Sequence, residues 1–188
     1  MIRSLLVIVG IACSCLAQAD FLDQKLVEIS SRDELSAKFV DIWRADYLDE
    51  DIVSRGNLHF KKPDTLIKKV TEPEKIIYTV SNDTVKIEKD NETKHIKLSE
   101  HPDLAVGIYA LRALLQGNRA ALDKIFLHQL RYSDERFQSW TLELFPKSSH
   151  NKQKIEQITV TGNKSNLQKL KVYYANGDTH VTLIEHHD

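Results

Sequence analysis

The most informative segment of this sequence is an alternating run that reads Gly56-Asn57-Leu58-His59-Phe60-Lys61-Lys62-Pro63. Leu58 and Phe60 alternate with polar neighbours, and a period of two is typical of a β-strand with one buried face. Pro63 ends the run, because proline lacks the N–H group that a sheet ladder requires. Gly56 lies inside the pattern and predicts a bulge or bend. The segment therefore predicts an amphipathic strand with a defined end.

Short strands are predicted on both sides of this segment. Leu35, Ala37, Phe39 and Trp43 share one face of a preceding strand, although Asp41 interrupts the apolar pattern. Turn residues separate the others, and Asn176-Gly177 is the strongest hairpin signal. These further strands cover residues 65–70, 75–81, 84–89, 93–98, 127–133, 137–145, 154–161, 167–175 and 178–185. About eleven strands in meander order predict an incomplete antiparallel β-barrel or a strongly curved sheet, within a mainly β (α+β) fold.

Helical periodicity replaces the strand pattern in two places. Residues 21–29 carry apolar side chains at spacings of four and three, which predicts an N-terminal helix. A second helix is predicted from Pro102 to a C-cap at Gly117, and Asn118 is a candidate N-cap for a short helix that ends at Ile125. The leucine stripe of the 102–116 helix fits ordinary core packing. It also fits a lid that closes the mouth of a half-barrel.

Composition limits the class of protein. The chain has 188 residues, of which 41% are hydrophobic and 28% charged, and this fits one globular domain. Its formal net charge is −1 at pH 7, so the sequence carries no basic footprint for a nucleic acid. We therefore expect no nucleic-acid partner.

The first nineteen residues resemble a secretory signal peptide. Arg3 supplies a positive charge, residues 5–12 are apolar, and Ala17-Gln18-Ala19 is a cleavage site of small residues. Cleavage after Ala19 would remove residues 1–19 and leave residues 20–188 as one exported domain. Both cysteines, Cys13 and Cys15, would leave with the peptide, so no disulfide is expected. The alternative is lipid modification of one cysteine, since residues 11–13 resemble part of a lipobox.

The pattern Gly-x-Leu-x-Phe-x-Lys-Pro at residues 56–63 resembles the second strand of the LolA family of periplasmic lipoprotein carriers. The resemblance extends to the order of elements along nearly the whole mature chain, including a strand that ends in Leu144-Phe145-Pro146-Lys147. It implies an incomplete antiparallel barrel with a helical lid over an apolar cavity. It also implies a monomeric periplasmic carrier, which takes acylated lipoproteins or related lipids from an inner-membrane transporter to an outer-membrane acceptor.

Two departures from the family pattern indicate a divergent member. Lys62 stands where the family commonly has an arginine that is linked to cargo release. Lysine keeps the charge but lacks the planar guanidinium fork, so the two residues are not equivalent. Family members often continue into another strand-forming segment, whereas this sequence stops at Asp188. The resemblance therefore leaves the cargo open, and Lys62 is the candidate residue for cargo release or transfer.

Candidate cavity residues are the apolar side chains on the predicted strands and lid. Those of the wall are Phe39, Trp43, Leu58, Phe60, Ile76, Tyr78, Trp140, Leu142 and Leu144, and those of the lid are Leu104, Ile108, Leu111 and Leu115. Burial of apolar surface explains such residues equally well as a closed core. The sequence alone does not separate wall from core.

Motifs for catalysis are missing from the sequence. Eight histidines are present, but none has the spacing of a His-Glu-x-x-His metal site. The sequence also contains neither a Gly-x-Ser-x-Gly elbow nor a P-loop. We therefore expect no enzyme, no catalytic residue, no metal and no cofactor. Two other classes stay open, a lipid- or peptide-sensing regulatory module on the same fold and an enzyme that uses His128 or His180.

Overall fold

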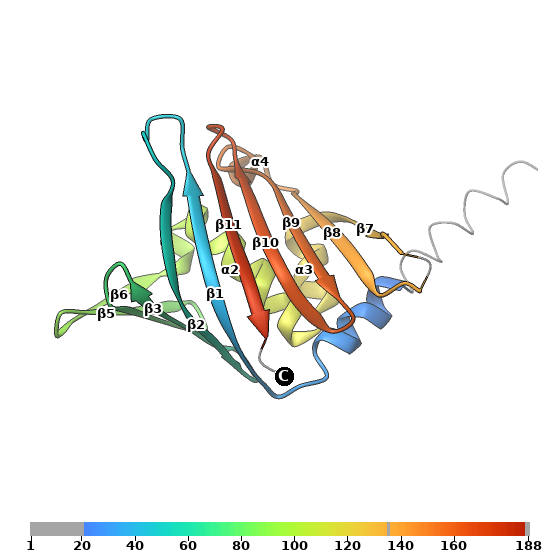
Figure 1. Cartoon of the computed structure of the whole chain (residues 1–188). Helices are drawn as coiled ribbons and strands as arrows, with labels where there is room; N and C mark the ends of the chain where they lie inside the picture. The colour runs from blue at the N-terminus through green and yellow to red at the C-terminus, as the bar shows by residue number, and fades with distance from the viewer. Residues whose placement is uncertain (1–20, 135, 187–188) are drawn as a thin grey trace, which may run out of the picture.

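The computed structural model describes residues 21–134 and 136–186, and these residues form one curved antiparallel sheet with helices on its concave side (Figure 1). The eleven strands follow the spatial order β6-β5-β4-β3-β2-β1-β11-β10-β9-β8-β7. Their bounds are β1 (Glu34–Arg44), β2 (Ile52–Lys61), β3 (Thr65–Glu72), β4 (Ile76–Ser81), β5 (Thr84–Lys89), β6 (Glu92–Lys97), β7 (Phe126–Tyr132), β8 (Ser139–Pro146), β9 (Ile155–Asn163), β10 (Asn166–Tyr174) and β11 (Thr179–His186). The predicted fold class and number of strands are confirmed.

The sheet consists of two meanders that meet at its centre. Strands β1 to β6 form one and β7 to β11 form the other, each with sequential neighbours paired. Antiparallel pairing of β1 with β11 joins them, with Phe39 opposite Ile184 and Trp43 opposite His180. The first and last strands of the described chain are therefore neighbours, and β6 and β7 are the two edges of the unclosed sheet.

The pairing of β2 is irregular at Gly56, where the sequence predicts a bulge or bend, and the extra residue is Thr71 on β3. The pairing of β2 with β3 shifts register between Arg55 and Gly56, which marks a β-bulge. A Cβ atom on Gly56 would lie 1.9 Å from the carbonyl oxygen of Lys69 and 2.9 Å from the Phe39 ring. Only glycine fits this close approach, so the packing of β2 against β3 and Phe39 depends on it. Beyond the bulge, alternation buries the side chains of Leu58 and Phe60 on the concave face.

The helices have the predicted caps. The N-terminal helix covers residues 21–29, and the later helices are η1 (Leu98–Glu100), α2 (Pro102–Gln116), α3 (Arg119–Ile125) and α4 (Ser149–Lys152). Helix α2 ends at Gly117, whose φ of 66° is the left-handed conformation of a glycine C-cap. The Asn118 side chain caps α3 by accepting a hydrogen bond of 3.0 Å from the Ala121 N–H. The elements η1 and α4, which are each about one turn long, were not predicted from the sequence.

The main core lies between the helices and the concave face of the sheet. The N-terminal helix contributes Leu22 and Leu26, and α2 and α3 contribute Leu114 and Leu122, each at most 1% exposed. These side chains share one cluster with buried residues of β8, β9 and β10, including Trp140, Leu142, Leu144, Ile158, Val160 and Val172. In the part of the chain that the structure describes, no helix is both long and apolar enough to cross a lipid bilayer.

Candidate binding cavity beneath helix α2

A cavity of about 390 Å³ lies between α2 and the concave face of the sheet. This volume falls in the range of about 300–1,000 Å³ that is usual for small-molecule sites. Strands β1 to β5 and β9 to β11 supply its walls, and α2 supplies its cover. Its lining residues are Asp41, Ser54, Leu58, Leu66, Lys68, Val70, Tyr78, Val80, Val85, Leu104, Gly107, Ile108, Leu111, Ile155, Leu170, Val172, Tyr174, His180, Thr182 and Ile184.

One face of α2 covers the cavity. Leu104, Gly107, Ile108 and Leu111 line it, and their spacing of three, one and three residues places them on a single helical stripe. Next to this stripe, Leu114 belongs to the main core and is fully buried. One stripe of α2 therefore covers the cavity, while another packs on the core, and the action of α2 as a lid stays a prediction.

The predicted wall and lid residues separate into four groups. Leu58, Tyr78, Leu104, Ile108 and Leu111 line the cavity. Phe60 and Leu115 line a neighbouring hollow that has room for about one water molecule.

Phe39 and Ile76 pack in a small apolar cluster with Leu58, and Trp43 is half-buried beside Tyr174 and His180. None of these three predicted wall residues is a cavity-lining residue. These three residues therefore lie behind or beside the cavity wall. Ligand binding by any of the predicted residues stays a prediction.

Trp140, Leu142 and Leu144 lie in the main core instead of the cavity wall. All three are at most 2% exposed, and they share the core cluster with residues of the N-terminal helix and α3. The indole N–H of Trp140 donates a hydrogen bond of 2.8 Å to the carbonyl oxygen of Lys164. The helices already cover the concave face of β8, so its apolar residues have no cavity to face.

A polar cluster lies on the cavity wall where the sequence showed only an interruption. Asp41 on β1 is 6% exposed and forms an ion pair with Lys68 on β3. Its Oδ1 atom accepts a hydrogen bond of 2.6 Å from the Thr182 hydroxyl and lies 3.4 Å from Nε2 of His180, both on β11. The sequence signal for this cluster was a carboxylate at an inward-facing strand position.

The Asp41 carboxylate is held in its ionised form. Burial alone would raise its pKa, but the hydrogen bond from His180 and the charges of Lys68 and His180 lower the pKa from 3.8 to about 2. Asp41 is therefore an anion at neutral pH, within a cavity whose other walls are mainly apolar.

Aromatic rings surround this polar end of the cavity. The Trp43 ring lies 4.9 Å from that of Tyr174 and 5.6 Å from that of His180, measured between centroids. The Lys68 ammonium lies 4.7 Å from the Phe39 ring centroid, within cation–π distance. The rings restrict where the Lys68 and His180 side chains can lie.

Lys62 lies outside the cavity, just after β2. Its Nζ atom is 3.1 Å from Oδ1 of Asp33, and its side chain is 35% exposed. Together with Pro63 and residues 116–119 it borders a shallow surface depression. The lysine therefore faces solvent at the end of the strand, and its role in cargo transfer stays a prediction.

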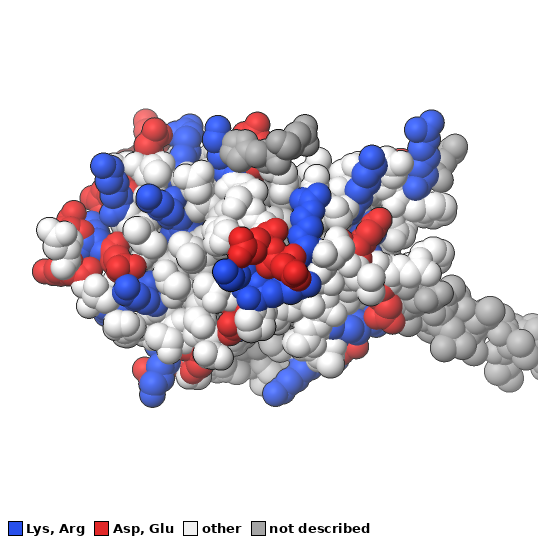
Figure 2. Space-filling model, turned by 90° about the horizontal axis from the view of Figure 1, so that it is seen from below, with Lys and Arg blue, Asp and Glu red and all other residues white. Residues whose placement is uncertain are grey.

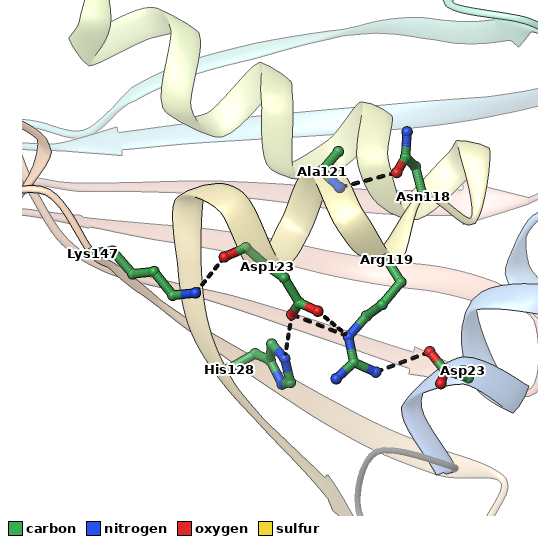
Figure 3. Close-up of polar contacts among 7 residues, drawn as sticks. All are labelled: Asp23, Asn118, Arg119, Ala121, Asp123, His128 and Lys147. Carbon is green, nitrogen blue, oxygen red and sulfur yellow. Dashed lines mark hydrogen bonds and ion pairs between the residues drawn. The ribbon is translucent and has the colours of Figure 1, made fainter.

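A second polar network joins the N-terminal helix, α3 and β7 (Figure 3). Arg119 donates to Oδ1 of Asp23 at 3.0 Å and to both carboxylate oxygens of Asp123. Nε2 of His128 lies 2.8 Å from Oδ1 of Asp123. Burial raises the pKa of Asp123, but the hydrogen bonds from Arg119 and His128 outweigh this and lower it. The network holds the N-terminal helix against α3.

Neither the Asp41 cluster nor the network around Arg119 and Asp123 resembles a metal centre. Within residues 21–134 and 136–186, no group of three or more His, Cys, Asp or Glu side chains could hold a metal ion.

On the face seen in Figure 2, cationic and anionic side chains are interspersed with uncharged surface. Neither sign of charge dominates that face. The predicted signal peptide, with Cys13 and Cys15, lies outside the described residues.

The chain belongs to the family described as "Outer membrane lipoprotein carrier protein LolA-like", whose sequence profile matches residues 12–187. The predicted family is therefore confirmed. A comparison with curated proteins gave no match.

Solved structures of similar proteins share little sequence with this chain. A LolA superfamily protein from Nitrosomonas europaea is 13% identical over 91% of this chain and 94% of its own, with a TM-score of 0.46. The lipoprotein LppX from Mycobacterium tuberculosis is 9% identical over 88% and 94%, with a TM-score of 0.45. A putative outer membrane lipoprotein-sorting protein domain from Vibrio parahaemolyticus is 10% identical over 87% and 88%, with a TM-score of 0.44. The family assignment itself rests on the sequence profile.

Proposed function

We propose that this protein is a periplasmic carrier that shields acyl chains of lipoproteins, or of related lipids, in the cavity beneath α2. It receives this cargo from an inner-membrane transporter and delivers it to an outer-membrane acceptor. The observation that carries the proposal is the cavity of about 390 Å³ between α2 and the sheet. Membership of the LolA-like family supports the class of cargo.

The energetics of acyl chains agree with such a cavity. Each CH₂ group that is removed from water gains about 0.8 kcal/mol, so an acyl chain needs a covered apolar route between membranes. Leu58, Leu66 and Val80 supply apolar walls from the strands, and Ile108 and Leu111 supply an apolar cover from α2. Helix α2 is connected to β6 through η1 and His101, and to β7 through Gly117, Asn118 and α3. Displacement of this helix would open the cavity without breaking the pairing of the strands.

The proposed protein acts by binding and not by catalysis, and the arrangement of polar groups in the cavity supports this. The Thr182 hydroxyl donates to Asp41, whose pKa of about 2 makes this carboxylate a weak base for the activation of a nucleophile. Nε2 of His128 faces Asp123, and this pair contributes to the network that holds the N-terminal helix. Export through the predicted signal peptide and a monomeric state are parts of the same proposal.

Native mass spectrometry of the mature protein, purified gently from the periplasm, tests the proposal. A bound lipid or acylated peptide is expected as a mass adduct, and solvent extraction identifies its class. If the purified protein carries no adduct, added acylated ligands are expected to bind. Failure of both the native and the added ligands to bind would refute the carrier function.

A pair of leucine variants tests the location of the site. Leu111→Asp places a charge in the cavity lining and is expected to weaken acyl-ligand binding strongly, while the protein is still secreted. Leu183→Asp is the matched control, because Leu183 is 40% exposed and is not a cavity-lining residue. Equal binding by the Leu111→Asp variant and the parent would show that the cavity is not the acyl site.

A further inference from the structure

The polar cluster gives the cavity two chemically different ends. The lining side chains that can carry a charge near neutral pH are Asp41, Lys68 and His180, and all three belong to this cluster. Apart from the cluster and Ser54, Tyr78, Gly107 and Tyr174, the lining residues are all leucine, isoleucine and valine. A long-chain hydrocarbon would fill only the apolar part. The cavity therefore fits an amphiphilic ligand whose polar head group lies beside the cluster.

Charge balance selects the kind of head group. The Asp41 carboxylate and the Lys68 ammonium form an ion pair, so their charges cancel when His180 is neutral. An anionic head group would approach Lys68 beside the existing Asp41 anion, and like charges at such distances repel. A head group without charge avoids this repulsion. It can still accept hydrogen bonds from a cation.

Lys68 has donors left for such a head group. An ammonium group has three N–H donors, and among the described residues the hydrogen bond of Lys68 is the one to Asp41. Its side chain is 28% exposed, although the neighbouring Leu66 and Val70 on the same face of β3 are buried. The remaining donors therefore belong to an ammonium group that lines the cavity and is held between Asp41 and the Phe39 ring.

We propose that the cavity selects acyl chains whose head group is an uncharged ester or amide, and that Lys68 donates a hydrogen bond to the carbonyl oxygen of that group. This inference rests on the proposed carrier function and specifies its cargo. Asp41 acts as the positioning residue, because it holds the Lys68 ammonium at the cavity wall. The linkage between acyl chain and head group, and not chain length alone, then determines which cargo binds.

Ligand displacement tests this selectivity. The apolar fluorescent probe N-phenyl-1-naphthylamine is titrated into the mature protein at pH 8 and then displaced by monolauroylglycerol or by laurate. Both competitors are used below their critical micelle concentrations and have the same acyl chain, but the first head group is a neutral ester and the second an anion. Monolauroylglycerol is expected to bind the parent protein more tightly than laurate.

The variant Lys68→Met keeps the length of the side chain and removes its donors. It is expected to weaken monolauroylglycerol binding about ten-fold relative to binding of the probe, which has no carbonyl acceptor; this is the effect of one hydrogen bond to a charged group. Lys69→Met is the matched control, because the next side chain on β3 points to the exposed face of the sheet. The double variant Asp41→Asn/Lys68→Met removes both charges, so it leaves no unpaired carboxylate in the cavity wall. It is expected to show the same loss of monolauroylglycerol binding.

Two results would overturn the inference while leaving the carrier function intact. One is a folded Lys68→Met or double variant that binds monolauroylglycerol as tightly as the parent. The other is tighter binding of laurate than of monolauroylglycerol by the parent, because charge balance would then not select the head group. If the parent bound neither the probe nor any acyl ligand, the carrier proposal would fail, and the inference with it.

Discussion

Replacement of Asp41 by asparagine is expected to destabilise the protein in a pH-dependent way. The substitution keeps the shape of the side chain but removes the charge that pairs with Lys68. It also removes the charged acceptor for Thr182. Lys68 would be left beside the cavity without its counter-charge, and this is a known source of large destabilisation in partly buried pairs.

The pKa of Asp41 gives the size of the effect. A carboxyl group that ionises at about 2 in the folded protein, instead of 3.8, stabilises the folded state by about 2 kcal/mol at neutral pH. Because this pKa is lowered by folding, the stabilisation is complete above about pH 5 and is lost as the pH falls from 3.8 towards 2. Asp41→Asn is therefore expected to unfold about 4–8 °C below the parent at pH 7.

Urea unfolding of the parent and the variant at a series of pH values measures this difference. The difference between their free energies of unfolding is expected to fall to about half by pH 3. Protonation of Asp41 then removes part of the stabilisation that its carboxylate gives the parent. Asp51→Asn is a control for general charge effects, since Asp51 pairs with the exposed Arg44. A gap that is absent at pH 7, or that stays constant from pH 7 to pH 3, would refute the assignment of the stabilisation to the Asp41 carboxylate.

Three further substitutions test features of the fold and of the strand end. Gly56→Ala is expected to cost about 1–3 kcal/mol in urea unfolding, because its Cβ would lie 1.9 Å from the Lys69 carbonyl oxygen, whereas Gly107→Ala should be tolerated with its nearest contact at 4.0 Å. Asn118→Ala should lower the free energy of unfolding by about 1 kcal/mol through loss of the α3 cap, and an unchanged value would contradict that role. Lys62→Leu should change cargo transfer to an acceptor without changing thermal stability, so normal transfer or an unfolded variant would count against the proposed role.

Local signals were sufficient to predict most of the fold. The strands were readable because apolar alternation was interrupted by turn residues such as Asn176-Gly177, which separate β10 from β11. The C-terminal end of α2 and the start of α3 were predictable because Gly117 adopts the left-handed conformation of a C-cap and the Asn118 side chain caps α3. These signals depend on neighbours in sequence, so they needed no knowledge of tertiary contacts.

The division of the concave face into cavity and core was not predictable from the sequence. Leu58 on β2 and Leu142 on β8 lie in similar alternating patterns, yet one lines the cavity and the other is covered by helices. That difference depends on where the N-terminal helix and α3 pack, and strand periodicity carries no information about it. The partners of Asp41 were hidden for the same reason, because Lys68 and Thr182 lie 27 and 141 residues further along the chain.

The central pairing of β1 with β11 has a consequence for how the protein reaches its native state. Each meander can form from local hairpins, but the cavity needs residues of β1 to β5 together with residues of β9 to β11. During synthesis the N-terminal meander emerges first, and its strand β1 remains unpaired on one side until the last strand is made. Contacts of such high sequence separation slow folding. The exposed edge of β1 is then open to other chains until β11 arrives, so aggregation at this stage competes with completion of the sheet.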